Sequence, residues 1–259
     1  MRSARSERLT RLAVAAAAAL LGVAVGLALP RVGSTAAAYV DSAAVSTPVS
    51  VRPCSGTWSS TVASLGPIRH LDFAAASALP GDVAAPGLLT CDDSGALTLH
   101  GSLEESWADP AGALTSTGAL SVTVWTSFTD TATPGDLLWL TQADGYGLGL
   151  GVSGGLLQVV EVPPGGGPPT VLVQTGAPGS APHLVTMTRS DAALTVYLDA
   201  TPVGSATLSA TSVSDVSLVL GAPAGSGDAS AHAVLDEVVV VPVTLDAGQV
   251  ATLAGSNVW

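Results

Sequence analysis

From Thr90 onward, the chain consists of short runs in which apolar and polar residues alternate, separated by clusters of Gly, Pro, Ser and Asp. Alternation with a period of two places successive side chains on opposite faces of a β-strand. Many short strands between turn clusters are typical of an antiparallel sandwich or barrel. The predicted strands are Ala96–His100, Ala119–Phe128, Asp136–Thr141, Tyr146–Val152, Leu156–Val162, Thr170–Gln174, His183–Arg189, Ala193–Leu198, Gly204–Leu208, Val216–Gly221 and Ala233–Val241.

The composition agrees with this pattern, because 29 Gly and 17 Pro favour turns over long helices. With 47% apolar residues the chain can also bury a substantial core. Helix signals are almost absent. The exception is Asp246–Leu253, where Asp246 and Gln249 form a capping box at the start of one or two helical turns.

The N-terminus has the three parts of an export signal. Met1–Arg11 is basic, Leu12–Leu29 is an uncharged apolar run, and Ala36–Ala38 offers small residues to a signal peptidase. We therefore expect residues 1–38 to be a signal peptide, forming a helix and cleaved between Ala38 and Tyr39. The alternative is an uncleaved anchor, since 18 apolar residues are just long enough to span a bilayer.

From Tyr39 onward the chain carries three arginines, no lysine and 19 acidic residues, a net charge of −16. Nucleic-acid binding needs a basic surface, and docking on anionic lipid needs one as well. The charge argues against both, so we expect membrane contact only through an uncleaved N-terminal segment. Secreted or cell-surface localisation fits the export signal.

Two cysteines, Cys54 and Cys91, are the only ones in the chain. In an exported protein an isolated pair most often forms a disulfide, which would stabilise the fold by roughly 3–4 kcal/mol. A zinc site is the alternative, but the spacing of His70 and His100 from these cysteines fits no zinc motif.

Glycine occupies every second position of Tyr146–Gly151. Such a bare face of a strand admits another backbone, an aromatic ring or a ligand at close range. Tight sheet curvature or packing against a second sheet is the structural explanation, and a ligand is the functional one. Trp125 and Trp139 lie in predicted strands, which favours core positions for both.

Five segments in order resemble the laminin-G-like, concanavalin A-like jelly roll. They are Leu120–Trp125, with the family's inward Trp; Tyr146–Leu150 with the Gly154–Gly155 turn; His183–Asp199; Leu218–Gly221 with Val234–Val238; and Leu245–Leu253. One departure is Ala200, where the family usually has Gly after its Tyr-x-Asp motif. The resemblance implies an all-β, antiparallel two-sheet jelly-roll sandwich over residues 95–255. Residues 39–94 are then additional strands and a loop held by the disulfide.

The resemblance also implies binding rather than catalysis. Glycosidases of this fold carry Glu-x-Asp-x-x-Glu on one strand, a pattern that this chain lacks. It also lacks the Gly-x-Ser-x-Gly elbow of serine hydrolases. Adjacent acids such as Asp236 and Glu237 would point to opposite faces of a strand. We expect a non-enzymatic module for glycan or protein ligands, with a glycoside hydrolase as the remotest alternative.

Related domains bind calcium through loop aspartates and backbone carbonyls, so calcium is a candidate cofactor. Asp130, Asp136, Asp144 and Asp228 lie in predicted loops or at strand ends and could meet at one rim of the sandwich. Of these, Asp136, Asp144 and Asp228 are the candidate ligands. The alternative is that they are ordinary turn residues.

A structural subunit of a surface layer or fibre is a further hypothesis. The junction Gly33–Ala43 resembles the start of biofilm-fibre and camelysin-like surface proteins, which assemble at the cell surface. The Ala- and Val-rich composition after this junction agrees with that hypothesis. Concentration-dependent polymerisation would distinguish it from a binding module.

Overall fold

The computed structural model describes residues 57–73, 85–86, 95–103, 106–108, 114–116, 118–223 and 225–256, all within the compact unit Ser50–Trp259. The predicted signal segment with Ala38 and Tyr39 lies outside the described residues. The same is true of the predicted disulfide partners Cys54 and Cys91. Both predictions stay open.

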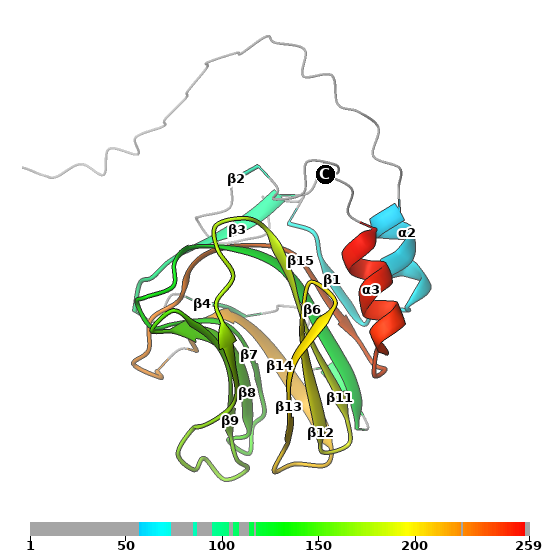
Figure 1. Cartoon of the computed structure of the whole chain (residues 1–259). Helices are drawn as coiled ribbons and strands as arrows, with labels where there is room; N and C mark the ends of the chain where they lie inside the picture. Colours follow the sequence, from blue (N-terminus) through cyan, green and yellow to red (C-terminus); the bar gives the residue numbers. More distant parts are fainter. Residues whose placement is uncertain are drawn as a thin grey trace, which may run out of the picture. The chain divides into compact units, whose positions relative to one another are not determined.

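Two antiparallel sheets form a sandwich, which confirms the predicted fold class (Figure 1). One sheet has the order β13 (Thr201–Thr207), β12 (Ala193–Leu198), β11 (His183–Ser190), β6 (Ala119–Asp130), β15 (His232–Val241), β3 (Gly95–His100) and β2 (Ala85–Pro86), with β1 (Arg69–Leu71) paired to β15. The other has the order β10 (Thr170–Gly176), β9 (Leu156–Val162), β8 (Gly147–Ser153), β7 (Gly135–Thr141), β14 (Val213–Gly221) and β4 (Ser106–Ala108), with β5 (Leu114–Ser116) paired to β14. We call them the β6 sheet and the β7 sheet.

The core between the sheets consists of the apolar residues from the alternating runs. Leu138 and Leu218 of the β7 sheet and Leu235 of the β6 sheet are completely buried. Burying one such side chain contributes about 1.5–3 kcal/mol. Because every second residue faces this core, the alternation in the sequence determines which face of each strand is left for other contacts.

The predicted strands agree closely with the observed ones. Leu156–Val162 and Ala193–Leu198 begin and end as predicted. The strand predicted at Gly204–Leu208 begins earlier, at Thr201, and contains Pro202. This is possible because β13 is an edge strand, where a missing backbone N–H breaks no ladder.

Two helices cover part of the outer face of the β6 sheet. They are α2 (Thr57–Ser64), which the sequence did not predict, and α3 (Ala247–Gly255), which has the predicted capping box at Asp246. Figure 1 shows them side by side. No helix in the described part of the chain is long and apolar enough to span a membrane.

Beneath the helices lies a second apolar cluster, separate from the core between the sheets. The rings of Trp58 and Trp125 meet edge to face there, with centroids 6.1 Å apart. The resemblance implied that Trp125 points into the core between the sheets, but it does not. It is buried on the opposite face of its strand, which the helices cover.

Glu237 joins α2 and β1 to this sheet. Its Oε2 accepts a hydrogen bond of 2.8 Å from the indole Nε1 of Trp58 and also contacts Nε2 of His70. The pairing register of β15 with β6 shifts between Asp236 and Val239, and Glu237 has a left-handed φ of 50° within that bulge. Asp236 pairs with Trp125 and Glu237 contacts Trp58, and both tryptophans belong to the outer apolar cluster, so the bulge breaks the strand alternation that we expected for these two acids.

Ala200→Gly is expected to stabilise the fold by about 0.5–1 kcal/mol. Asp199 and Ala200 form the turn between β12 and β13 with φ values of 48° and 67°, and only Gly adopts such values without strain. Asp199 is itself anchored, because its carboxylate accepts from the amide of Leu184 at 2.9 Å and pairs with His183 Nδ1 at 2.5 Å. Urea unfolding measures the change.

Ala206→Gly is the matched control for this prediction. Ala206 lies within β13 and packs against the core, and its φ is not left-handed. Glycine there is expected to destabilise by about 0.5–1 kcal/mol. Equal effects of the two variants would show that the left-handed φ of Ala200 has no energetic consequence.

Candidate functional site

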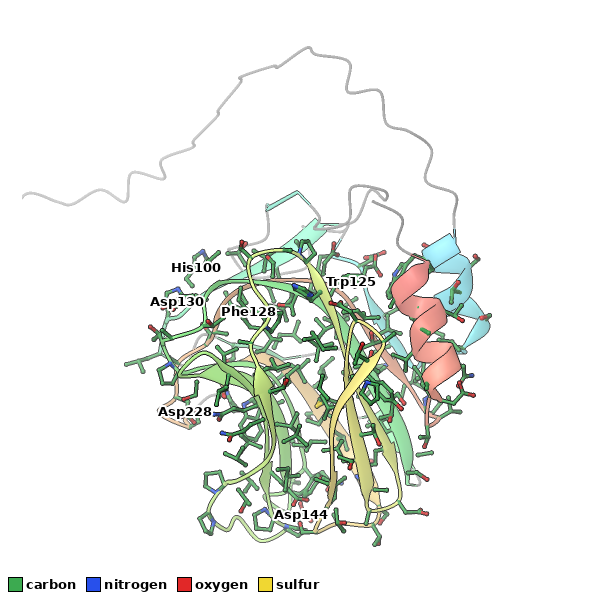
Figure 2. The ribbon with its side chains drawn as sticks, viewed as in Figure 1. His100, Trp125, Phe128, Asp130, Asp144 and Asp228 are labelled. Atoms are coloured by element: carbon green, nitrogen blue, oxygen red, sulfur yellow. The ribbon has the colours of Figure 1, made fainter. Side chains whose placement is uncertain are left out.

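The structure separates the three predicted calcium ligands into two groups. Asp136 lies at the start of β7, and Asp144 lies in the turn that follows the end of this strand, so the two occupy opposite ends of the sheet. Asp228, from the loop before β15, shares a groove with Asp136. Figure 2 shows Asp144 far from Asp228.

The groove has a volume of about 230 Å³ and lies where β7, β8 and β9 meet the loop that precedes β15. Two carboxylates, an amide and a hydroxyl line it together with small apolar groups. The lining residues are Pro134, Gly135, Asp136, Gly151, Val152, Ser153, Gln158, Val160, Asp228 and Ala229. These described residues include no Arg, Lys or His, so the charge of the groove is negative.

Backbone hydrogen bonds hold the two aspartates at this groove. The amide of Asp136 donates to the carbonyl of Ala229 at 2.9 Å, and the amide of Ala231 donates to the carbonyl of Asp136 at 2.7 Å. Asp136 and Ser230 thereby form a parallel bridge. This bridge places the loop with Asp228 directly beside β7, although the two segments are far apart in the sequence.

Of the glycines of β8, Gly151 lines the groove, and the other two lie beyond it along the strand. Leu148 and Leu150 face the core, so Gly147, Gly149 and Gly151 face outward. A Cβ atom on Gly149 would lie 2.5 Å from Cε2 of Trp139, so the indole rests directly on this glycine.

The alternating glycines thus have both a structural and a functional consequence. Trp139 covers Gly147 and Gly149, whereas the groove opens at Gly151, beside the carboxylate of Asp136. Trp139 is only 8% exposed, but it belongs to neither apolar cluster of the described residues. The prediction of a core position for Trp139 is correct for its burial but not for its location on the outer face of the β7 sheet.

Asp136 has an unusual electrostatic environment. Burial of its carboxylate, together with repulsion from Asp228, raises its pKa from 3.8 to about 6, although hydrogen bonding from the indole N–H of Trp139 opposes the rise. Asp136 Oδ2 and Trp139 Nε1 are both buried, and the indole N–H approaches the carboxylate closely enough to lower its pKa without reaching strict hydrogen-bond geometry.

The other two loop aspartates have local partners. Asp144 accepts from the amide of Tyr146 at 2.9 Å. Asp130 accepts from the hydroxyl of Thr133 at 2.6 Å and the amide of Ala132 at 2.8 Å, and these bonds lower its pKa. Both are turn-forming contacts. Within the described ranges, no three His, Cys, Asp or Glu side chains gather closely enough to hold a metal ion.

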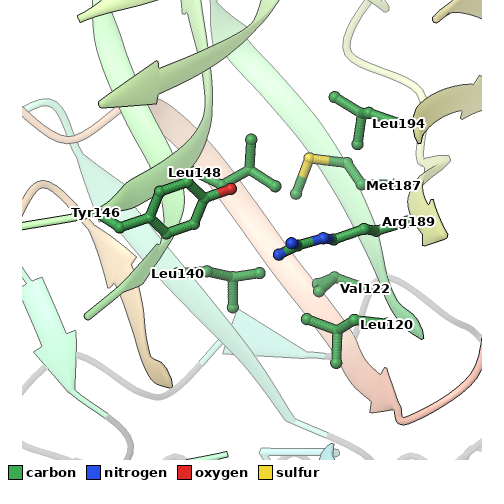
Figure 3. Close-up of a pocket in the computed structure, with 8 residues that line it drawn as sticks. All are labelled: Leu120, Val122, Leu140, Tyr146, Leu148, Met187, Arg189 and Leu194. Atoms are coloured by element: carbon green, nitrogen blue, oxygen red, sulfur yellow. The ribbon is translucent and has the colours of Figure 1, made fainter. Parts of the chain in front are cut away.

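A second polar group lies between the sheets, at the opposite end of β8 (Figure 3). The guanidinium of Arg189 donates to the carbonyls of Asp191 and Ala210 at 2.7 and 2.8 Å, and the hydroxyl of Tyr146 points toward it. Burial raises the pKa of Tyr146 to about 12. The adjoining cavity of about 10 Å³ has room for about one water molecule, too little for a ligand.

Comparison with known proteins supports the sandwich fold. The sequence model of the concanavalin A-like lectin/glucanases superfamily matches residues 103–251. Domain 4 of AbnA, a GH43 extracellular arabinanase from Geobacillus stearothermophilus solved with arabinotriose, is 17% identical with a TM-score of 0.55, covering 71% of this chain and 96% of that one. The binding domain of botulinum neurotoxin serotype G is 10% identical with a TM-score of 0.51, covering 68% of this chain and 45% of that one.

At these identities, the two solved structures establish a shared fold and nothing more. This chain spans less than half of the neurotoxin binding domain. No curated protein sequence matches the chain closely enough to count as a relative.

Proposed function

The chain belongs to the concanavalin A-like lectin/glucanases superfamily, and we propose on this basis that it is an exported, non-enzymatic binding module that holds a glycan in the groove between Asp136 and Asp228. The observation that carries the proposal is the concave groove of about 230 Å³ that Asp136, whose pKa is raised to about 6, lines together with Asp228 and Gln158. Binding sites combine a concave surface with a few convergent polar groups and perturbed pKa values.

The similar structures support a binding role in general terms. The arabinanase domain was solved with arabinotriose, and the similar neurotoxin structure is a binding domain. We favour a glycan over a protein ligand here because the groove is small, polar and concave. Protein partners usually occupy larger and flatter surfaces.

A glycan array probed with the purified protein tests this proposal. Specific binding is expected, and Asp136→Asn and Asp228→Asn are each expected to weaken it about 10-fold or more, since each removes a charged hydrogen-bond acceptor. Asp215→Asn is the matched control, because Asp215 is exposed and lies outside the groove. An array without any bound glycan would refute the proposal and shift attention to protein ligands.

Calcium is a second part of the proposal, supported by the two carboxylates in the groove. The array is therefore repeated with calcium and with EDTA. If calcium binds in this groove, EDTA is expected to abolish glycan binding. Asp136→Asn and Asp228→Asn are then expected to show the same loss, whereas Asp144→Asn keeps binding. Binding that survives EDTA would remove calcium from the proposal.

A glycoside hydrolase is the second candidate, because Asp136 and Asp228 resemble an acid–base pair with different environments. We favour binding alone, because Asp136 Oδ2 is buried rather than presented to the groove as a proton donor. Incubation with the glycans that bind on the array is expected to release no reducing ends. Release that Asp136→Asn abolishes would establish the hydrolase instead.

The proposed extracellular location rests on the N-terminal signal pattern. N-terminal sequencing of the protein from the culture medium is expected to begin at Tyr39. The same preparation also tests the fibre hypothesis, since a fibre subunit would show a mass that grows with concentration in light scattering.

A further inference from the structure

We infer that the groove binds an amino sugar, with the primary ammonium group of the sugar held between the carboxylates of Asp136 and Asp228. This inference rests on the proposed function and narrows its ligand class. It follows from the charges that line the groove and from the polar side chains there that have no partner within the described part of the protein.

The polar side chains of the groove are available to a ligand. Asp228 donates a hydrogen bond from its backbone amide to the hydroxyl of Ser226 at 3.0 Å, but its exposed carboxylate has no hydrogen-bond or ionic partner among the described residues. The half-buried side chain of Gln158 has none there either. Asp130 and Asp144 differ in this respect, because turn contacts occupy their carboxylates.

Asp136 presents one carboxylate oxygen to the groove. Its Oδ2 is buried, but Oδ1 is not, and Oδ1 lies against Gly151, where an alanine Cβ would be 3.2 Å from it. Gly151 also lines the groove. Because glycine carries no side chain, a ligand can approach the backbone there closely and reach Oδ1. The buried indole of Trp139 approaches the same carboxylate, so the ligand adds a second donor to it.

The groove contains no positive charge that would balance its two carboxylates. Burial raises the pKa of Asp136 to about 6, and repulsion from Asp228 adds to this rise. The described lining residues include no Arg, Lys or His. A cation between the carboxylates relieves their repulsion, whereas a neutral sugar leaves it unchanged and a uronic acid or sulfated sugar increases it. The electrostatics therefore favour a positively charged ligand.

An ammonium group matches these acceptors better than a calcium ion does. It donates up to about three hydrogen bonds and accepts none, and the carboxylates of Asp136 and Asp228 and the side-chain carbonyl of Gln158 can accept them. Calcium takes about six to eight oxygen ligands. In the described ranges no third carboxylate joins this pair. The ammonium group of the ligand then occupies the position proposed above for calcium, so the experiment must separate the two cations.

The shape of the groove favours an ammonium group on a compact ring over one at the end of a long side chain. Its volume of about 230 Å³ lies below the 300–1,000 Å³ or so of sites that enclose drug-sized molecules. The hydroxyl of Ser153 and the amide N–H groups of Gln158 also line it, and they can bond to the hydroxyl groups of a sugar ring. A lysine side chain would bring the charge but no hydroxyl groups.

The test is isothermal titration of the purified protein in EDTA at pH 7.0, where an amine of the α-amino type is mostly protonated and Asp136 is mostly ionised. The probes are methyl glucosaminide, its N-acetyl form and methyl glucoside, together with the same three galactose derivatives. The N-acetyl form keeps the ring and the nitrogen but removes the charge. N-acetyl-lysine methylamide carries the ammonium group without a sugar ring.

The expected result has three parts. In at least one series, the amino sugar binds about 10-fold or more tightly than its N-acetyl form, its neutral counterpart and the lysine compound. Asp136→Asn and Asp228→Asn each reduce this preference about 3–10-fold, whereas Asp215→Asn, outside the groove, leaves it unchanged. The preference declines below about pH 6, as Asp136 is protonated, and above about pH 8, as the sugar amine loses its proton.

Other outcomes separate this inference from the proposed function. Equal binding of the charged and neutral sugars overturns the inference while the groove remains a glycan site. The same holds if the preference for the amino sugar survives in both Asp136→Asn and Asp228→Asn, or if every sugar binds only when calcium is added. Equal binding of the lysine compound overturns the assignment to a sugar. If no sugar binds here or on the array, with or without calcium, the proposed function fails together with the inference.

Discussion

Asp136→Asn is expected to make the domain more stable at pH 7.5 by about 1–3 kcal/mol, although it removes ligand binding. The wild-type carboxylate is charged at this pH while largely removed from water and close to Asp228. Asparagine has nearly the same shape and no charge, so the desolvation and repulsion disappear. Urea unfolding at pH 7.5 measures the difference.

The pH dependence of the effect follows from the direction of the pKa shift. The pKa of Asp136 is raised from 3.8 to about 6 on folding, so between these values the folded state holds a proton that the unfolded state has lost. The contribution of Asp136 to stability is therefore most favourable below about pH 4 and declines as the pH rises through 6. We expect Asp136→Asn and the wild type to converge in stability toward pH 4.5.

Asp215→Asn is the control, since removal of an exposed charge is expected to change stability by less than about 0.5 kcal/mol. A destabilised Asp136→Asn at pH 7.5 would contradict the argument, because the carboxylate would then stabilise the fold. The Asp136→Asn variant is thus predicted to gain stability and to lose binding. A buried charge that opposes folding and supports binding is typical of a functional site.

The sequence predicted most of the sandwich because its strands follow a simple rule. In β6, β9 and β12 the apolar residues that alternate in the sequence are those that face the core. The capping box at Asp246 is equally local, and α3 begins after it as predicted. Signals that depend only on neighbouring residues were sufficient for these elements.

Features that depend on distant partners could not be predicted. Helix α2 has only Trp58 and Val62 buried among its described side chains, so its position depends on contacts with Glu237 and Trp125, which are distant in the sequence. The bulge at Glu237 follows from pairing between strands and leaves no local pattern. The sequence indicated aspartates as candidates, but only the bridge between Asp136 and Ser230 brings Asp228 to the groove.

The close packing of Trp139 on β8 can be tested at Gly149. Gly149→Ala is expected to destabilise the domain by about 2–4 kcal/mol, because its Cβ would lie 2.5 Å from Cε2 and 2.6 Å from Cζ2 of Trp139. The indole cannot move away freely, because it is 8% exposed and packed against its neighbours. Urea unfolding measures the loss.

Gly176→Ala is the matched control, since Gly176 also lies in a strand of the β7 sheet, but an alanine Cβ at that position would have no described atom within 4 Å. That variant is expected to be neutral or slightly stabilising.

The decisive comparison is a double-mutant cycle with Trp139→Val, which makes room above β8. If the indole causes the clash, Gly149→Ala costs at least about 1 kcal/mol less in the Trp139→Val background than in the wild type. Equal costs in the two backgrounds would show that the strand itself requires glycine at this position and that the indole of Trp139 is not the cause of the destabilisation.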